Sequence, residues 1–158
     1  MSSCQKLAHG RELNFLNQNP ECVFTKGACH IFAYRLIMEK EYFMKPSIGY
    51  FFIEKGPIKS SLHHQALHVF VADDNLRYDV RGRFCRDEFL DYWRAETGKG
   101  KLKEKLAHII DYELFVTPES QGSFDNKLGL YSEPEFVKKA CALAEDYIPR
   151  YKTKLGWV

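Results

Sequence analysis

The spacing of apolar residues predicts a buried helix near the start of the chain. From Ala28 to about Lys40, apolar side chains recur at steps of three to five residues, which is typical of a helix buried on more than one side. Upstream, residues 6–17 are expected to form a short helix or an extended lead-in. Residues 17–20 are expected to form a turn, because a proline disfavours helix in the residue before it. Residues 21–26 are then a connector.

Apolar runs after this helix predict an antiparallel meander. Ile48–Ile53 and Leu67–Val71 have the length of strands and are rich in β-branched and aromatic side chains. Residues 73–75 are Asp, Asp and Asn, which tolerate the backbone of a hairpin turn. Leu76–Val80 follows as a third strand, and residues 81–83 are expected to end it.

The last part of the chain alternates helical and polar patterns. Arg86–Ala95 has the apolar spacing of a helix, whereas the basic run 97–105 is expected to be a loop or the start of another helix. Ile109–Val116 is apolar enough for a fourth strand, and a final helix is expected from residue 133 to about 147. The order is helix, antiparallel meander, helices, so we expect an α+β fold in a single domain, residues 1–158.

Charge and composition exclude several classes of protein. The 23 basic and 21 acidic residues leave a net charge of +2. This balance gives no strong indication of binding to nucleic acid or to anionic membranes. No apolar run approaches the roughly 18 residues of a membrane span, and the N-terminus lacks the apolar core of a signal peptide. We therefore expect a cytoplasmic protein, with export by a signal-independent route left open.

The five cysteines are scattered and odd in number, and none lies in a zinc-binding spacing. We expect free thiols in a reducing compartment, with no metal and no cofactor. Cys85 lies among basic residues but has no histidine near it in sequence, so we expect it to be structural.

Cys29 stands out because it falls on the first turn of the predicted helix. Helix N-termini carry unsatisfied N–H groups and partial positive charge, which stabilise a thiolate. Gly27 can adopt a positive φ and leaves room for a substrate backbone. Ala28 and His30 are expected to contact substrate as well. His30 is a poor base for Cys29, because adjacent helical residues point about 100° apart.

His68 and Asp79 are the expected partners of this cysteine. A nucleophilic thiol needs an imidazole to hold its proton and a third group to orient that imidazole. His68 shares a strand face with Phe70. A hairpin centred on Asp74 brings Asp79 nearly opposite His68. The pattern is thus a cysteine on a helix, a histidine on a strand and an aspartate on the next strand.

Three short motifs carry a resemblance to a known superfamily. They are Gly27-x-Cys29-x-x-Phe32-Ala33, His68-Val-Phe-Val and Tyr78-Asp79-x-x-Gly82. Together they resemble the minimal core of the papain-like and transglutaminase-like cysteine enzymes, over roughly residues 26–82. The resemblance implies a Cys29–His68–Asp79 triad in a helix packed on an antiparallel meander.

The activity implied is that of a thiol-dependent hydrolase or acyltransferase. Its target is an amide, isopeptide or thioester carbonyl, and its substrate a protein or peptide. Peptidases, amidases of bacterial cell-wall turnover, deamidases and bacterial toxins share this kind of core. The resemblance also implies an oxyanion hole. We expect the Cys29 N–H as its first donor. The second is expected to be the side chain of Gln18, or of its neighbours Asn17 or Asn19, on the lead-in loop.

Two other interpretations remain open from the sequence. The chain could be a catalytically inactive binding module on the same fold, with Cys29 and His68 as buried core residues. It could also be a metal-dependent hydrolase that uses His63, His64 and His68. The first would separate Cys29 from His68, and the second would bind zinc.

Overall fold

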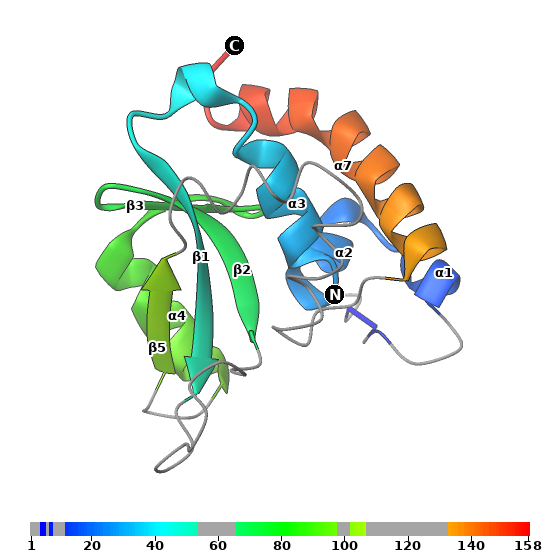
Figure 1. Cartoon of the computed structure of the whole chain (residues 1–158), viewed down its shortest axis with the longest axis horizontal. Helices are drawn as coiled ribbons and strands as arrows, with labels where there is room; N and C mark the ends of the chain where they lie inside the picture. The colour runs from blue at the N-terminus through cyan, green and yellow to red at the C-terminus, as the bar shows by residue number, and fades with distance from the viewer. Residues whose placement is uncertain (1–3, 6, 8–11, 54–65, 98–101, 107–132) are drawn as a thin grey trace.

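The structure is a computed structural model, and it describes residues 4–5, 7, 12–53, 66–97, 102–106 and 133–158 (Figure 1). Its helices are α1 (Glu12–Phe15), α2 (Pro20–Lys26), α3 (Cys29–Leu36), the 3₁₀ helix η1 (Lys40–Tyr42), α4 (Arg86–Thr97) and α7 (Pro134–Lys154). Its strands are β1 (Pro46–Ile53), β2 (His68–Asp73), β3 (Leu76–Asp79), β4 (Gly82–Cys85) and β5 (Leu102–Leu106).

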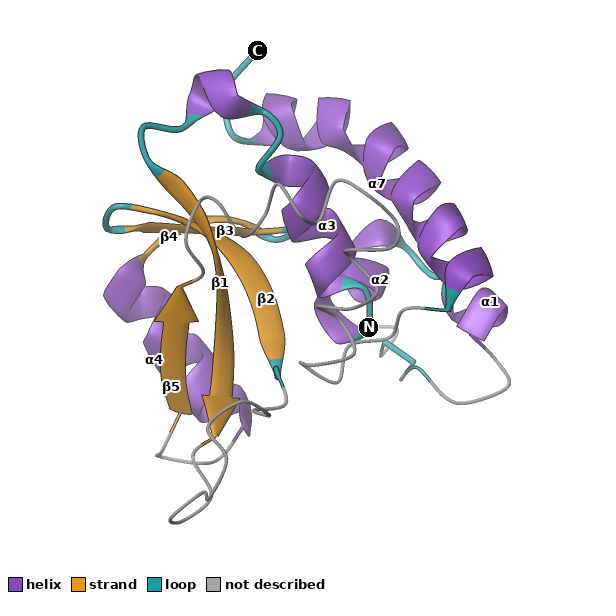
Figure 2. Cartoon of the chain, viewed as in Figure 1, coloured by secondary structure: helices purple, strands orange, loops and turns teal. Residues whose placement is uncertain are grey.

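The described strands form one antiparallel sheet in the order β4-β3-β2-β1-β5 (Figure 2). Strands β1 to β4 follow one another as a meander, and β5 returns to the free edge of β1. The mixture of helices with an antiparallel sheet confirms the expected α+β class. No helix among the described residues is long and apolar enough to cross a membrane.

Helices cover both faces of this sheet, because side chains alternate between the faces along each strand. On one face, Val69 and Val71 join a large core with α2, α3 and α7. On the other, Phe70 packs with Phe89 and Trp93 of α4 in a smaller core. Figure 1 shows α3 and α7 on one side of β2 and α4 on the other. The candidate site described below lies where the two layers meet.

Residues 21–26 are a helix, so the prediction of a connector is wrong. The side chain of Asn19 accepts a hydrogen bond from the Cys22 N–H at 3.0 Å and caps the start of α2. Pro20 occupies the first turn, where its missing N–H costs nothing. The same two residues that indicated a turn therefore begin a helix.

Residues 102–106 form an edge strand, so the prediction of a loop or helix within the basic run is also wrong. Leu102 is buried and Glu104 half-buried, while the lysines between and after them are exposed. Glu104 pairs with Arg77 at 2.9 Å. This alternation of inward and outward residues is the period of a strand.

Residues 82–85 form the further strand β4, although residues 81–83 were expected only to end the third strand. Gly82 has φ +143°, a conformation that L side chains rarely adopt, and it lets the chain turn back immediately after Asp79. The N–H of Arg86 then donates to Asn75 O at 2.9 Å, which ties the start of α4 to the preceding hairpin.

The observed ends of two helices differ from the predicted ends. Helix α3 ends at Leu36 rather than near residue 40, and η1 follows it. Helix α7 extends to Lys154, beyond the predicted end near residue 147, and contains Pro149. The predicted strand Ile109–Val116 lies outside the described residues.

Cys4 and Cys22 form a disulfide, so the prediction of five free thiols is wrong. The bond joins residues 18 apart in sequence and attaches the N-terminal segment to α2. Sequence spacing could not reveal it, because the two cysteines are 18 residues apart and form no recognisable motif. The other cysteines, Cys29, Cys85 and Cys141, are thiols.

Candidate active site

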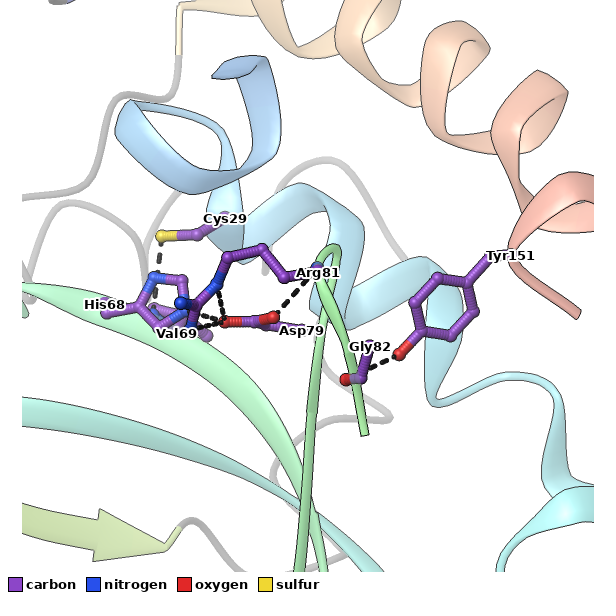
Figure 3. A network of polar contacts seen from close by, with 7 residues as sticks. All are labelled: Cys29, His68, Val69, Asp79, Arg81, Gly82 and Tyr151. Atoms are coloured by element: carbon purple, nitrogen blue, oxygen red, sulfur yellow. Dashed lines mark hydrogen bonds and ion pairs between the residues drawn. The ribbon is translucent and has the colours of Figure 1, made fainter. Parts of the chain in front are cut away.

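Cys29 begins α3 and points toward the start of β2. Its side chain is 7% exposed, and its Sγ accepts a hydrogen bond from the Val69 N–H at 3.3 Å (Figure 3). Position N1 of a helix leaves the Cys29 N–H without an intrahelical acceptor. The thiol therefore lies at the positive end of α3, and one backbone donor already contacts the sulfur.

The residues next to Cys29 serve packing. Gly27 has φ −164°, an extended conformation, so the expected positive φ is absent. A Cβ at Gly27 would lie 2.8 Å from Phe15 Cζ and 3.2 Å from Leu7 Cβ. Ala28 is fully buried. The missing side chain of Gly27 therefore leaves room for Phe15 and Leu7. The substrate contacts expected of Gly27 and Ala28 stay predictions.

His68 and Asp79 are in contact, as the hairpin predicts. His68 Nε2 lies 3.0 Å from Asp79 Oδ2, and both side chains are almost fully buried. The register pairs Val71 with Tyr78, which places Asp79 diagonally across from His68 on the same face of the sheet. The carboxylate thus fixes which nitrogen of the ring carries the bonded proton.

The other nitrogen of His68 is left for the thiol. Nδ1 is buried and, among the described residues, makes no hydrogen bond of standard geometry. Figure 3 shows the sulfur of Cys29 and the ring of His68 pointing toward one another. The two groups are near enough that each shifts the pKa of the other.

Burial and neighbouring charges act in opposite directions on these groups. Burial raises the pKa of the Cys29 thiol, but contacts with His30 and His68 outweigh it and lower the pKa to about 6. Burial lowers the pKa of His68, yet Asp79 and Cys29 raise it above its ordinary value. Burial likewise opposes the ionisation of Asp79, while His68 and Arg81 hold its pKa below the ordinary range. At neutral pH these directions favour a thiolate beside an imidazolium.

Helix α4 holds the ring of His68 in place. Trp93 stacks on the imidazole with ring centroids 4.1 Å apart and planes 25° apart. Phe89 and Phe70 contact the same ring at 6.0 and 6.3 Å between centroids. The imidazole is therefore confined by aromatic rings from its own strand and from α4.

Arg81 is a second charged partner of the Asp79 carboxylate, and its guanidinium contacts the same oxygen as His68. Its Nη2 lies 2.8 Å and its Nε 3.2 Å from Oδ2, and its backbone N–H donates to Oδ1 at 2.9 Å. Sequence reasoning missed both Arg81 and Trp93. The spacing Asp79-x-Arg81 was a usable signal for the arginine, whereas the contact of Trp93 depends on how α4 docks.

His30 is fully buried beside Cys29, and it lowers the pKa of the thiol. Its ring makes an edge contact with Tyr34 at 5.9 Å between centroids. The structure thus gives His30 an influence on Cys29 that the angle between adjacent helical residues did not suggest. The predicted contact of His30 with substrate is not tested by this placement.

The Gln18 side chain is hydrogen-bonded to the N-terminal segment and to α1. Its Nε2 donates to Gln5 O and Phe15 O, and its Oε1 accepts from the Gln5 N–H. The Cys29 N–H, the other predicted oxyanion donor, lies at the start of α3. The role of Gln18 as the second donor stays a prediction.

The described residues hold no cluster of three or more His, Cys, Asp or Glu side chains suited to a metal ion. His63 and His64, which the metal-dependent interpretation needs, lie outside the described residues. No family model matches the chain, and no curated protein or solved structure is detectably similar to it. The local chemistry of Cys29, His68 and Asp79 is therefore the basis for assigning a function.

Proposed function

We propose that this protein is a thiol-dependent hydrolase or acyltransferase of the papain-like or transglutaminase-like kind, with Cys29 as nucleophile. The observation that carries the proposal is a thiol with a pKa of about 6 beside an imidazole bonded to a buried carboxylate at 3.0 Å. An ordinary structural cysteine has a pKa near 8.5 and is inert when buried in apolar surroundings.

The reaction follows from the roles of the three groups. The Cys29 thiolate attacks the carbonyl carbon of an amide, isopeptide or thioester, and negative charge develops on the carbonyl oxygen. The Cys29 N–H at the start of α3 is the proposed donor to that oxygen. The His68 imidazolium then gives its proton to the leaving group, which departs and leaves a thioester on Cys29.

The second half of the reaction releases the acyl group. Neutral His68 removes a proton from water or from an amine as that group attacks the thioester. The Cys29 thiolate leaves, and the proton stays on His68, which restores the starting pair. Water gives hydrolysis or deamidation, and an amine gives acyl transfer. Asp79 holds the tautomer and orientation of His68 through both halves and stabilises the imidazolium. The proposed substrate is a protein or peptide.

Competitive labelling of the three thiols tests the assignment. The full-length protein is treated at pH 6.5 with substoichiometric iodoacetamide and, separately, with peptidyl electrophiles, and the modified residue is located by mass spectrometry. Cys29 should react before Cys85 and Cys141, although Cys141 is exposed and Cys29 is buried, because Cys29 is largely thiolate at this pH.

Two variants complete the test. Cys29→Ala should abolish labelling by the peptidyl electrophiles, and turnover of any substrate found with them, without loss of the folded circular dichroism spectrum. Cys141→Ser is the matched control and should behave as wild type. Preferential labelling of Cys85 or Cys141, or full turnover by Cys29→Ala, would overturn the assignment and favour a binding module.

A further inference from the structure

The carboxylate of Asp79 is held from two sides by groups of different kinds. His68 Nε2 contacts Oδ2, and Arg81 contacts both oxygens through its guanidinium and its own backbone N–H. Oδ2 is therefore shared between the imidazole and the guanidinium. The side chain of Asp79 is 2% exposed and that of Arg81 14% exposed, so water contributes little to this arrangement.

Aromatic rings surround the guanidinium of Arg81. Its Cζ lies 4.0 Å from the centroid of the Tyr92 ring, and three more rings contact it at 5.2 to 5.9 Å, those of Phe84, Phe89 and Trp93. A cation over the face of an aromatic ring within about 6 Å is attracted to it. The rings come from β4 and α4, so the position of Arg81 is fixed by elements other than its own.

We propose that Arg81 is a positioning residue for the triad: held by these rings, its guanidinium fixes the rotamer of Asp79 so that Oδ2 faces His68. This inference rests on the proposed function of Cys29, His68 and Asp79. Without Arg81 the buried carboxylate would keep one charged partner, and burial would favour its protonation or its rotation away from the ring.

The charges of the site support this role. Cys29, His68, Asp79 and Arg81 form a row of alternating negative and positive groups whose sum is zero when all are ionised. Removing the last cation leaves a net negative charge in a buried site, which is costly. Loss of Asp79 as an ionised partner would lower the pKa of His68 and, through it, raise the pKa of the Cys29 thiol.

Other titratable groups adjoin this row on three elements. His30 of α3 lies beside Cys29, and Tyr92 of α4 contacts Arg81. Tyr151 of α7 is coupled to Asp79, but its pKa lies well above 10, mainly because it is buried, so it stays neutral below that pH. Of these, His30 is the group that contacts Cys29, and it is unchanged in the variants below.

The rate of alkylation of Cys29 by iodoacetamide, measured from pH 4.5 to 9, tests the proposal without any knowledge of the substrate. Arg81→Met removes the charge and keeps an apolar stem among the rings. We expect the midpoint of the profile to rise by about one pH unit, so that the rate at pH 6 falls about fivefold. Arg94→Met is the matched control, because Arg94 lies on α4 with its side chain 45% exposed, and it should keep the wild-type profile.

Two further variants make the test independent of the folding of Arg81→Met. Arg81→Lys keeps the charge with fewer donors, and we expect a smaller upward shift of the midpoint. Tyr92→Leu removes the nearest ring at a position that is 44% exposed, and should shift the midpoint in the same direction. A merely structural role would lower the melting temperature and leave the midpoint of the folded protein unchanged.

The outcomes distinguish this inference from the proposed function. A wild-type midpoint in Arg81→Lys and Tyr92→Leu, or in folded Arg81→Met, overturns the role of Arg81. A downward shift also overturns it, since that is the result expected if Arg81 only competes with His68 for Asp79. Failure of the proposed function would instead appear in the wild type, as a Cys29 whose midpoint lies near 8.5 like that of an ordinary thiol.

Discussion

At the scale of single residues, the site depends on groups that are each costly to bury alone. His68 and Asp79 are nearly without solvent, yet each is charged or hydrogen-bonded because the other is present. The lowered pKa of Cys29 has the same origin, since burial by itself would raise it. The reactivity proposed for Cys29 is therefore a property of its partners as much as of its place on α3.

The stability contributed by Asp79 should depend on pH in a defined direction. Its pKa in the folded protein lies below the ordinary 3.8, so the ionised carboxylate stabilises the fold fully above about 3.8. That contribution is lost as the pH falls through the folded value. Asp79→Asn should cost on the order of 3 kcal/mol at pH 6, and its difference from wild type should shrink toward pH 3.

Melting temperatures from pH 3 to 7 measure this effect. Asp91→Asn serves as control, because Asp91 is 78% exposed and pairs with Arg94 only at 4.0 Å. That variant should follow the wild type at every pH. A difference between Asp79→Asn and wild type that stays constant or grows on acidification would contradict the lowered pKa of Asp79.

The contact between His68 and Asp79 could be predicted because its signals are local. His68 lies in an alternating strand, and the turn after Asp73 fixes the register that brings Asp79 to it. Arg81 and Trp93 act on the same site through the docking of α4, which no local pattern encodes. The hydrogen-bond partners of Gln18, Gln5 and Phe15, could not be predicted, because an amide in a loop has no period that reveals its partners.

At the scale of elements, the sheet depends on one position without a side chain. Gly49 of β1 pairs with Phe70 on one side and with Leu106 on the other. A Cβ there would lie 2.5 Å from Phe70 Cε2 and 2.9 Å from Leu106 Cδ2. Phe70 needs this space to reach the core beneath α4.

Gly49→Ala should therefore destabilise the protein by about 1–3 kcal/mol through overpacking. Urea unfolding followed by fluorescence measures the loss, and Ser47→Ala on the same strand is the control, with an expected change below about 0.5 kcal/mol. Phe70→Leu in the Gly49→Ala background should recover part of the loss. An unfolding free energy of Gly49→Ala equal to that of wild type would show that the Phe70 ring moves aside freely.

Elements were predictable where one face is apolar and the other polar. β2 and α4 follow this rule. In β5 the alternation of buried and exposed residues is not visible in the sequence, because three of its five residues are charged. α2 was missed for a different reason, since Asn19 and Pro20 suit a turn and a helix start equally well. The choice between them is made by the burial of Val23 and Phe24 against α3.

At the scale of the whole molecule, the disulfide joins the N-terminal segment to the helical layer that carries Cys29. Cys4 is bonded to Cys22 of α2, and Leu7 lies against Gly27, two residues before Cys29. The cross-link closes a loop whose ends are 18 residues apart. Its main effect should be on the free energy of the unfolded chain.

Cys4→Ser should lower the free energy of unfolding by about 2–3 kcal/mol. Urea unfolding with and without dithiothreitol measures it: the reductant should destabilise the wild type by a similar amount and leave Cys4→Ser unchanged. Cys141→Ser should respond to the reductant as the wild type does. A wild type that is insensitive to reductant under conditions that yield five alkylatable thiols would contradict this stabilising role.

The position of the triad across the two layers has a further consequence. Cys29 packs in the core formed with α3 and α7, whereas the ring of His68 packs against Trp93 of α4 on the opposite face of the sheet. A small shear of one helical layer along the strands would change the approach of sulfur to imidazole without breaking a bond inside either layer. A fully folded chain could therefore have an unreactive Cys29. The rate of Cys29 alkylation would then report how the two helical layers are aligned.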